Sequence, residues 1–122
     1  YVVPLHYGYE MKDGKLTFYV HGAKEGHKLD CLRKNDHVFV EIDRGENLIT
    51  ADTPCSHGAE YQSVMCRGTA TIIEEPAEKC KALEILMKVQ TGEEHRISEK
   101  MADAVTVIKV DVESYTAKAR VR

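Results

Sequence analysis

The stretch "FYVHGAKEGHKLDCL" (residues 18–32) places a strand-like run before a helix-like run, with a short connection between them. The apolar run ends at His21. The eight residues 21–28 then hold two glycines, two lysines and two histidines. A short helix is predicted over 28–34, because Leu29 and Leu32 are spaced i, i+3.

The junction lacks both common nucleotide-binding motifs, since neither G-x-x-x-x-G-K-[ST] nor G-x-G-x-x-G occurs there. A helix that begins near Gly26 still presents free N–H groups and the positive end of its dipole. Gly22 lets the backbone approach a ligand closely, and Lys24 and Lys28 add positive charge. The segment therefore indicates a site for one phosphate group. The alternative is an ordinary glycine-containing connection whose lysines are solvated.

Composition indicates one globular domain over residues 1–122, with 43% hydrophobic and 30% charged residues. A formal net charge of −3 argues against nucleic acid, which requires clustered lysine and arginine. No apolar run reaches the roughly 18 residues of a membrane helix, and no signal peptide is visible. We therefore expect a cytoplasmic protein that binds neither nucleic acid nor membrane.

The four cysteines are predicted to be free thiols in a reducing compartment. Cys31 and Cys80 fall in helix-like runs, where they serve as small apolar residues. No metal site is predicted, because there is no Cys-x-x-Cys pair and Cys55-x-His57 is a single half-motif.

The order of elements favours a mainly β protein. Alternation and turn signals predict two further features: a long polar loop over 44–60 and, in Gly68, a bulge or close backbone approach. Helices are predicted at 28–34, from Pro76 to a stop at Gly92, and at 98–104 with Ser98 as N-cap. Strands are predicted at 1–5, 16–20, 37–43, 61–74, 105–112 and 115–122. Five or six mostly hairpin-connected strands with few helices fit an antiparallel β-barrel with peripheral helices.

Four segments resemble the FMN-binding split-barrel family, which includes the pyridoxamine phosphate oxidases, and its nitroimidazole-resistance branch looks nearest. They are "YVVPL" (1–5), "FYVHGAKEGHKLDCLRKND" (18–36), "YQSVMCRGTA" (61–70) and "EEPAEKCKALEIL" (74–86). The two most specific motifs are H-x-x-x-x-G-x-K at His21, Gly26 and Lys28, and Y-x-S-V at Tyr61, Ser63 and Val64.

This resemblance implies a six-stranded antiparallel, Greek-key-like split barrel that forms a homodimer with FMN at the subunit interface. The segment 21–28 would hold the FMN phosphate, and His21 would be the reactive or substrate-contacting group. Members of the family carry an N-terminal helix and first strand that this sequence lacks. The implied cofactor-binding residues are Val2, Val3, Pro4, His21, Gly22, Ala23, Gly26, Lys28, Tyr61, Ser63 and Val64.

Three functions stay open. The first is an FMN-dependent oxidoreductase acting on a small molecule, in its sharper form a nitroimidazole or another nitro-aromatic. Pyridoxamine phosphate oxidase activity is disfavoured, because the substrate-phosphate arginines are not found. The second is a non-enzymatic heme or flavin binder or sensor, with His21 or His57 as an axial ligand. The third is an interaction domain with an empty barrel.

Overall fold

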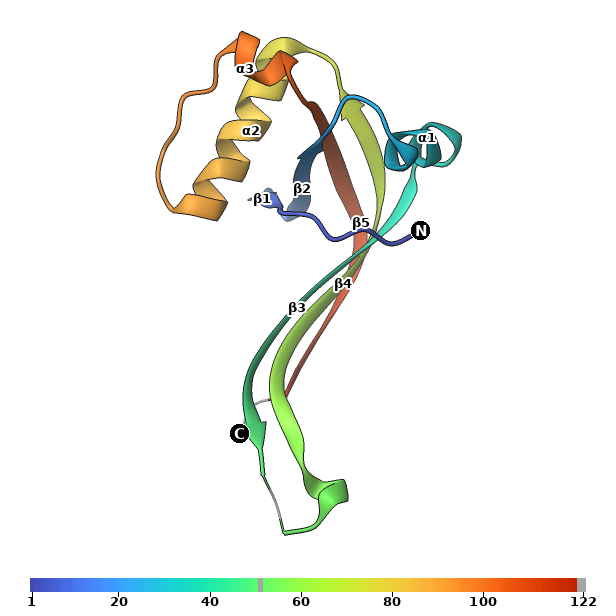
Figure 1. Cartoon of the computed structure of the whole chain (residues 1–122), viewed down its shortest axis with the longest axis vertical. Helices are drawn as coiled ribbons and strands as arrows, with labels where there is room; N and C mark the ends of the chain where they lie inside the picture. The colour runs from blue at the N-terminus through green and yellow to red at the C-terminus, as the bar shows by residue number, and fades with distance from the viewer. Residues whose placement is uncertain (51, 121–122) are drawn as a thin grey trace.

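A computed structural model describes residues 1–50 and 52–120, and within these ranges the protein forms one five-stranded antiparallel sheet with helices at its side (Figure 1). The strand order is β1-β2-β5-β4-β3. The strands are β1 (Gly8–Lys12), β2 (Lys15–Gly22), β3 (His37–Ile49), β4 (Gly58–Ile73) and β5 (Thr106–Arg120). The helices are α1 (His27–Lys34), α2 (Pro76–Thr91) and α3 (Glu99–Asp103), with a 3-10 turn at Pro54–Ser56.

The predicted mainly β fold and its Greek-key arrangement are confirmed. Strands β3, β4 and β5 follow one another as antiparallel neighbours, and β2 lies beside β5 after a long connection through α1. Three consecutive strands with a fourth returned beside the end of the set form a Greek key. The tight turn between β1 and β2 places Asp13 and Gly14 at φ 52° and 78°, as a two-residue hairpin requires.

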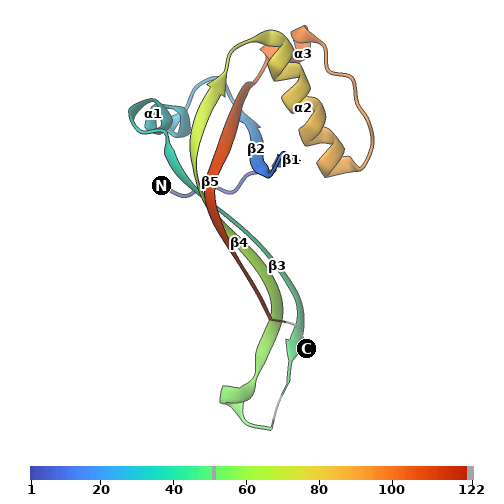
Figure 2. The ribbon, with the colours of Figure 1, turned by 180° about the vertical axis from the view of Figure 1, so that it is seen from behind.

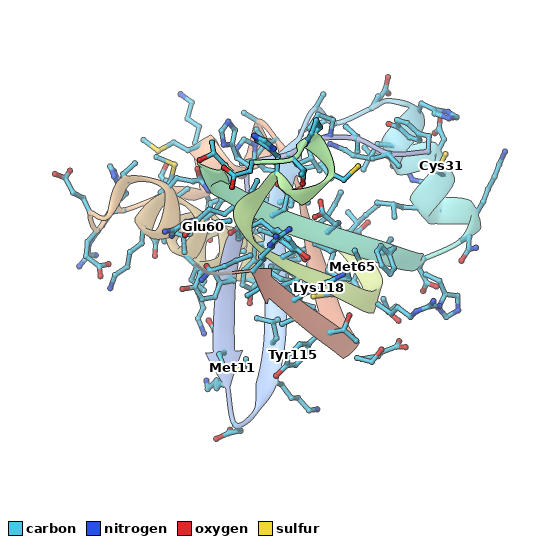
Figure 3. All side chains as sticks on the ribbon, turned by 90° about the horizontal axis from the view of Figure 1, so that it is seen from below. Met11, Cys31, Glu60, Met65, Tyr115 and Lys118 are labelled. Atoms are coloured by element: carbon cyan, nitrogen blue, oxygen red, sulfur yellow. The ribbon has the colours of Figure 1, made fainter. Side chains whose placement is uncertain are left out.

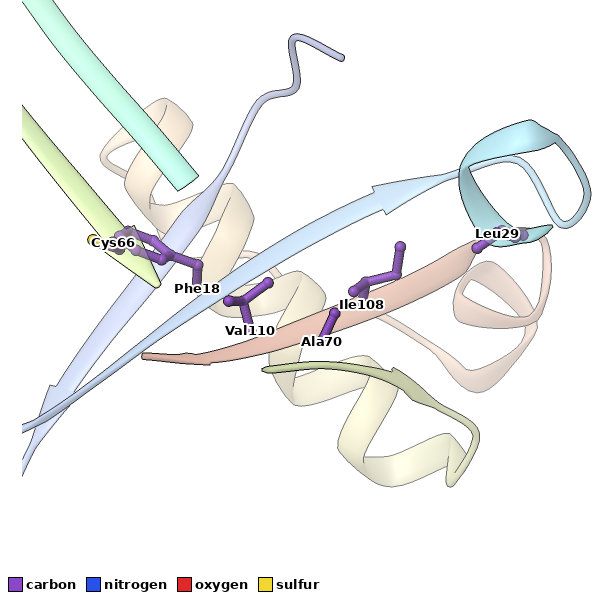
Figure 4. Packing of buried hydrophobic residues seen from close by; sticks show 6 residues of the cluster. All are labelled: Phe18, Leu29, Cys66, Ala70, Ile108 and Val110. Atoms are coloured by element: carbon purple, nitrogen blue, oxygen red, sulfur yellow. The ribbon is translucent and has the colours of Figure 1, made fainter. Parts of the chain in front are cut away.

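The core lies between the sheet and α1 on one face and between the sheet and α2 with α3 on the other (Figure 2). The first face is shown in Figure 4; its buried residues are Phe18, Leu29, Cys66, Ala70, Ile108 and Val110. The second buries Ile73, Ala82, Leu83, Ala102 and Val107. Leu29 is 1% exposed and Leu32 packs beside the same cluster, and their burial holds α1, and with it the 22–27 loop, against the sheet.

The helix boundaries agree with the sequence prediction because their caps are local. The Glu75 carboxylate accepts hydrogen bonds from the Ala77 and Glu78 amides at the start of α2. Gly92 ends that helix in the left-handed conformation, with φ 77°. Ser98 caps α3 by accepting a hydrogen bond from the Met101 amide at 3.2 Å.

The three longest strands continue beyond the core as a twisted ribbon, which we call the arm: residues 43–49, 58–63 and 118–120 (Figures 1 and 2). No helix covers it. Three large apolar side chains lie exposed at its base, Phe39, Met65 and Tyr115, with exposed fractions of 56%, 46% and 57%.

Three sequence predictions are wrong: the strand at 1–5, the loop over 44–60 and the separate strand at 115–122. The described residues form five strands, not six, since residues 1–5 pair with no strand and β1 starts at Gly8. Pro4 has no N–H to give to a ladder, and the Asp13–Gly14 turn aligns 8–12 with β2 instead. The loop over 44–60 is mostly strand, with β3 running to Ile49 and β4 starting at Gly58. Residues 43–45, where β3 enters the arm, are all exposed, so the apolar alternation that signals a strand is missing there.

The C-terminal residues form one strand, β5, rather than two. Residues 121 and 122 of the predicted last strand lie outside the described residues. The predicted close approach at Gly68 is confirmed: the register between β4 and β5 shifts between Arg67 and Gly68, and a Cβ on Gly68 would lie 2.5 Å from the Asp111 carbonyl oxygen. Among the described residues, no helix has the length and apolar character needed to cross a membrane.

Candidate functional site: the loop between β2 and α1

The loop between β2 and α1 leaves the start of the helix open. Gly26 is the N-cap residue at φ 148°, a conformation that suits glycine, and no side chain caps the helix. The first intrahelical bond runs from the Asp30 amide to the Gly26 carbonyl. The amides of the first turn therefore have no side-chain acceptor, which is the arrangement that binds an anion.

Lys28 folds back over the end of β2. A Cβ built on Gly22 would lie 2.5 Å from the Lys28 Nζ, so glycine leaves the space that the ammonium group occupies. Lys28 is half-buried, and its ammonium has no carboxylate partner among the residues described. The lysine thus brings an unneutralised positive charge to the same loop that presents the free amides.

Lys24, in contrast, is neutralised within the fold. Its Nζ lies 3.6 Å from the Asp103 carboxylate at the end of α3. Both side chains are largely exposed, at 54% and 84%, so the ion pair is weak and salt-sensitive. Ala23, predicted to contact the cofactor, lies exposed in the same loop.

A pocket of about 320 Å³ lies beside this loop and is lined by Pro4, Leu5, His6 and His21. The structure thus brings Pro4 and His21 together, although they are far apart in sequence. His6 is a pocket residue that sequence reasoning missed; only its place two residues after Pro4 could have suggested it. Val2 is 96% exposed and does not line the pocket.

The second predicted motif lies elsewhere in the chain. Tyr61 and Ser63 are half-buried on one face of the arm, and Val64 faces the other side, where it packs against the first core cluster. Within the sheet, Ser63 pairs with Asp43 and with Lys118. A single chain therefore does not place Tyr61 and Ser63 at the 21–28 loop (Figure 1).

A second hollow of about 390 Å³ lies at the far side of α2, lined by Glu84, Glu94, His95 and Arg96. Its wall is held by an ion pair between Lys88 and Glu94 at 2.6 Å. The hydrogen bond and charge of Lys88 lower the pKa of the Glu94 carboxyl, and those of Glu94 raise the pKa of Lys88. None of the predicted site residues lines this hollow.

The antiparallel sheet with a few helices packed beside it is the fold of the split barrels, a class of small β proteins. Within this class, the family model described as pyridoxamine 5'-phosphate oxidase matches residues 1–119. The chain belongs to that family, and the predicted resemblance is confirmed.

Solved structures support the same assignment. A candidate 5-nitroimidazole antibiotic resistance protein from Bacteroides thetaiotaomicron is 36% identical, with a TM-score of 0.81, covering 98% of this chain and 68% of that one. The flavocytochrome Anf3 from Azotobacter vinelandii is 19% identical with a TM-score of 0.77, covering 100% and 56%. An FAD- and heme-binding protein from Mycobacterium smegmatis is 14% identical with a TM-score of 0.69, covering 94% and 65%.

The last two likenesses concern the fold alone. The chain spans little more than half of the Anf3 chain and just under two thirds of the mycobacterial one. The comparison with curated proteins gives no match.

Proposed function

We propose that this protein binds FMN and reduces a small molecule, with nitroimidazoles as the substrate class. The observation that carries the proposal is the half-buried Lys28 ammonium, which has no carboxylate partner among the described residues and lies over Gly22 beside the uncapped start of α1. A phosphate monoester would supply the negative charge that this cluster lacks. The 36% identity to a candidate 5-nitroimidazole resistance protein supports the substrate class.

Only some of the predicted cofactor-binding residues lie together in one chain, and these fit the cofactor. Gly22, Ala23, Gly26 and Lys28 would hold the phosphate, while Pro4 in the adjacent pocket would lie against the isoalloxazine ring. When bound, FMN supplies the two-electron chemistry, and the chain binds and orients both partners.

A homodimer is the second part of the proposal. Tyr61 and Ser63 lie in the arm, away from the 21–28 loop, so one flavin can contact both motifs only if two chains contribute. Phe39 and Met65 lie on one face of the sheet at the base of the arm, and they are exposed apolar side chains that such contact would bury. Figure 3 shows Met65. Sedimentation of the purified protein tests this: a monomer at every concentration would refute the shared site.

The proposed function is tested by the visible spectrum of the protein after incubation with excess FMN and removal of unbound flavin. Retained flavin bands, followed by anaerobic reduction of the flavin and its reoxidation by a nitroimidazole, are the expected result. A folded protein that retains no flavin would refute the proposal. Flavin that is retained but not reoxidised would refute the substrate class only.

A second candidate, heme binding, rests on the two histidines that line one pocket, His6 and His21. Both are exposed, so a planar group could reach their imidazoles. Heme and flavin have different visible spectra, and the same incubation with hemin distinguishes them. Loss of the heme bands in a His21→Ala variant would assign that residue as the ligand.

His21 is expected to act on the substrate rather than on the cofactor. Two-electron reduction of a nitro group consumes protons, and an imidazole at the pocket can donate one. We expect His21→Ala to slow reoxidation of reduced flavin by a nitroimidazole by about tenfold or more, because general acids contribute about 10²–10⁴-fold. The affinity for FMN should change little. His37→Ala, an exposed histidine at the start of β3, is the control; equal rates in both variants would contradict the role.

Asp103 is expected to oppose phosphate binding, because it neutralises Lys24 at 3.6 Å. Asp103→Asn frees this lysine and should tighten FMN binding by about two- to fivefold at low salt, the scale of an exposed ion pair. Titration of protein fluorescence or flavin absorbance at two salt concentrations measures it. Weaker binding in Asp103→Asn would mean that the ion pair holds the loop in its binding shape instead.

A further inference from the structure

The hollow of about 390 Å³ beside α2 is lined by two opposite charges that do not pair with each other. Glu84 and Arg96 both line it, yet no ion pair joins them among the described residues. The proposed flavin function uses neither residue. A carboxylate and a guanidinium that share a hollow without touching leave room for a ligand that carries both charges.

The connection between α2 and α3 runs back along α2, and Glu84 holds it there (Figure 1). The Glu84 Oε2 accepts a hydrogen bond from the Ile97 amide at 2.9 Å. This bond uses one of the two carboxylate oxygens of a half-buried side chain. The other oxygen keeps its lone pairs for a cationic group.

His95 is made a hydrogen-bond acceptor by the hydroxyl that it contacts. The Thr91 hydroxyl donates to the Met87 carbonyl at 2.8 Å, so its oxygen accepts from the Nε2 of His95 at 3.1 Å. A neutral His95 therefore carries its proton on Nε2, and its Nδ1 is an acceptor. Glu84 and His95 thus give the hollow two acceptors that suit an ammonium group.

Arg96 gives the hollow a free donor. Its side chain is exposed and forms no hydrogen bond or ion pair with any described residue. The other carboxylate of the lining, Glu94, is already neutralised by Lys88 at 2.6 Å. A guanidinium binds a carboxylate through two parallel hydrogen bonds. Arg96 is therefore available to the carboxylate of an external ligand.

We propose that this hollow binds a free α-amino acid. The carboxylate of the amino acid contacts Arg96, and its ammonium group contacts Glu84 and His95. A neutral amino acid matches the lining, in which the charges of Glu84 and Arg96 balance and Glu94 is neutralised by its own lysine. The volume of about 390 Å³ lies within the range of about 300–1,000 Å³ that is typical of small-molecule sites.

Titration of the purified protein with the neutral L-α-amino acids, L-glutamine first, tests the proposal without any flavin. The expected result is a saturable shift of the NMR signals of the His95 ring. The amine that glutamine gives on decarboxylation and the acid that it gives on deamination each lack one charged group. Each should bind at least about tenfold more weakly, because a hydrogen bond to a charged group is lost. No saturable shift with any of these amino acids, or equal binding of glutamine and either analogue, would overturn the proposal.

Two variants assign the contacts. Arg96→Gln should remove the preference for glutamine over the amine, because the contact to the carboxylate is gone. Glu84→Gln should remove the preference for glutamine over the acid, while its amide oxygen can still accept from the Ile97 amide. Lys81→Gln, which removes an exposed charge of α2 outside the hollow, is the matched control and should bind as the unmodified protein does. An Arg96→Gln variant that still prefers glutamine to the amine would refute the site.

Discussion

We expect a Lys28→Glu variant to bind FMN at least about 100-fold more weakly while its fold stays intact. The substitution removes a charge-assisted contact, worth about 1.5–3 kcal/mol in general, and places a carboxylate where a phosphate would bind. The helix itself is not harmed, because an acidic residue in the first turn interacts favourably with the helix dipole. The same change therefore separates the site from the stability of α1.

Riboflavin provides the sharpest readout, since it carries the isoalloxazine ring without the phosphate. The unmodified protein should bind FMN much more tightly than riboflavin, and Lys28→Glu should bring the two affinities together. Lys34→Glu is the matched control, because it makes the same change of charge in the last turn of the same helix. Equal loss in both variants would indicate a general charge effect; FMN binding unchanged in Lys28→Glu would remove the phosphate site.

The loop was predictable because its signals are local. Two glycines and two lysines between a strand and a helix specify an uncapped helix start with positive charge around it. The structure adds two contacts that residue spacing cannot predict. Lys28 turns back over Gly22, and Lys24 pairs with Asp103, which lies 79 positions after it in the chain. The ends of α2 and α3 were equally predictable, since Glu75, Gly92 and Ser98 act within their own turns.

The β3 part of the arm was not predictable, and the reason is its exposure. A strand is recognised when apolar residues alternate toward a core, but Asp43 and Arg44 lie on strand β3 with both faces in solvent. Pairing with β4 makes this segment a strand, and pairing is a long-range property that propensity does not carry. The strand that carries Tyr61 and Ser63 was predicted at 61–74, but its distance from the 21–28 loop depends on how the strands pair, which residue spacing does not show.

A Gly68→Ala variant is expected to lose about 2–3 kcal/mol of unfolding free energy, near the upper end of the cost of forcing a group into a packed interior. Gly68 is buried in β4, which lies between β3 and β5. Its added Cβ would lie 2.5 Å from the Asp111 carbonyl oxygen and 3.0 Å from the Val110 Cγ1. A carbonyl of a central strand cannot move aside as a long side chain can, so the register shift at Arg67/Gly68 would have to rearrange.

Urea unfolding at fixed protein concentration measures this loss, and the thermal midpoint should fall by roughly 8–12 °C. Gly45→Ala is the matched control, because Gly45 also lies in a strand and its added Cβ would meet nothing within 4 Å. Its stability should change by no more than about 0.5 kcal/mol. If Gly68→Ala unfolds at the same urea concentration as Gly45→Ala, the backbone of β5 at Asp111 moves aside without cost. Glycine at position 68 would then not be what fixes the register shift between β4 and β5.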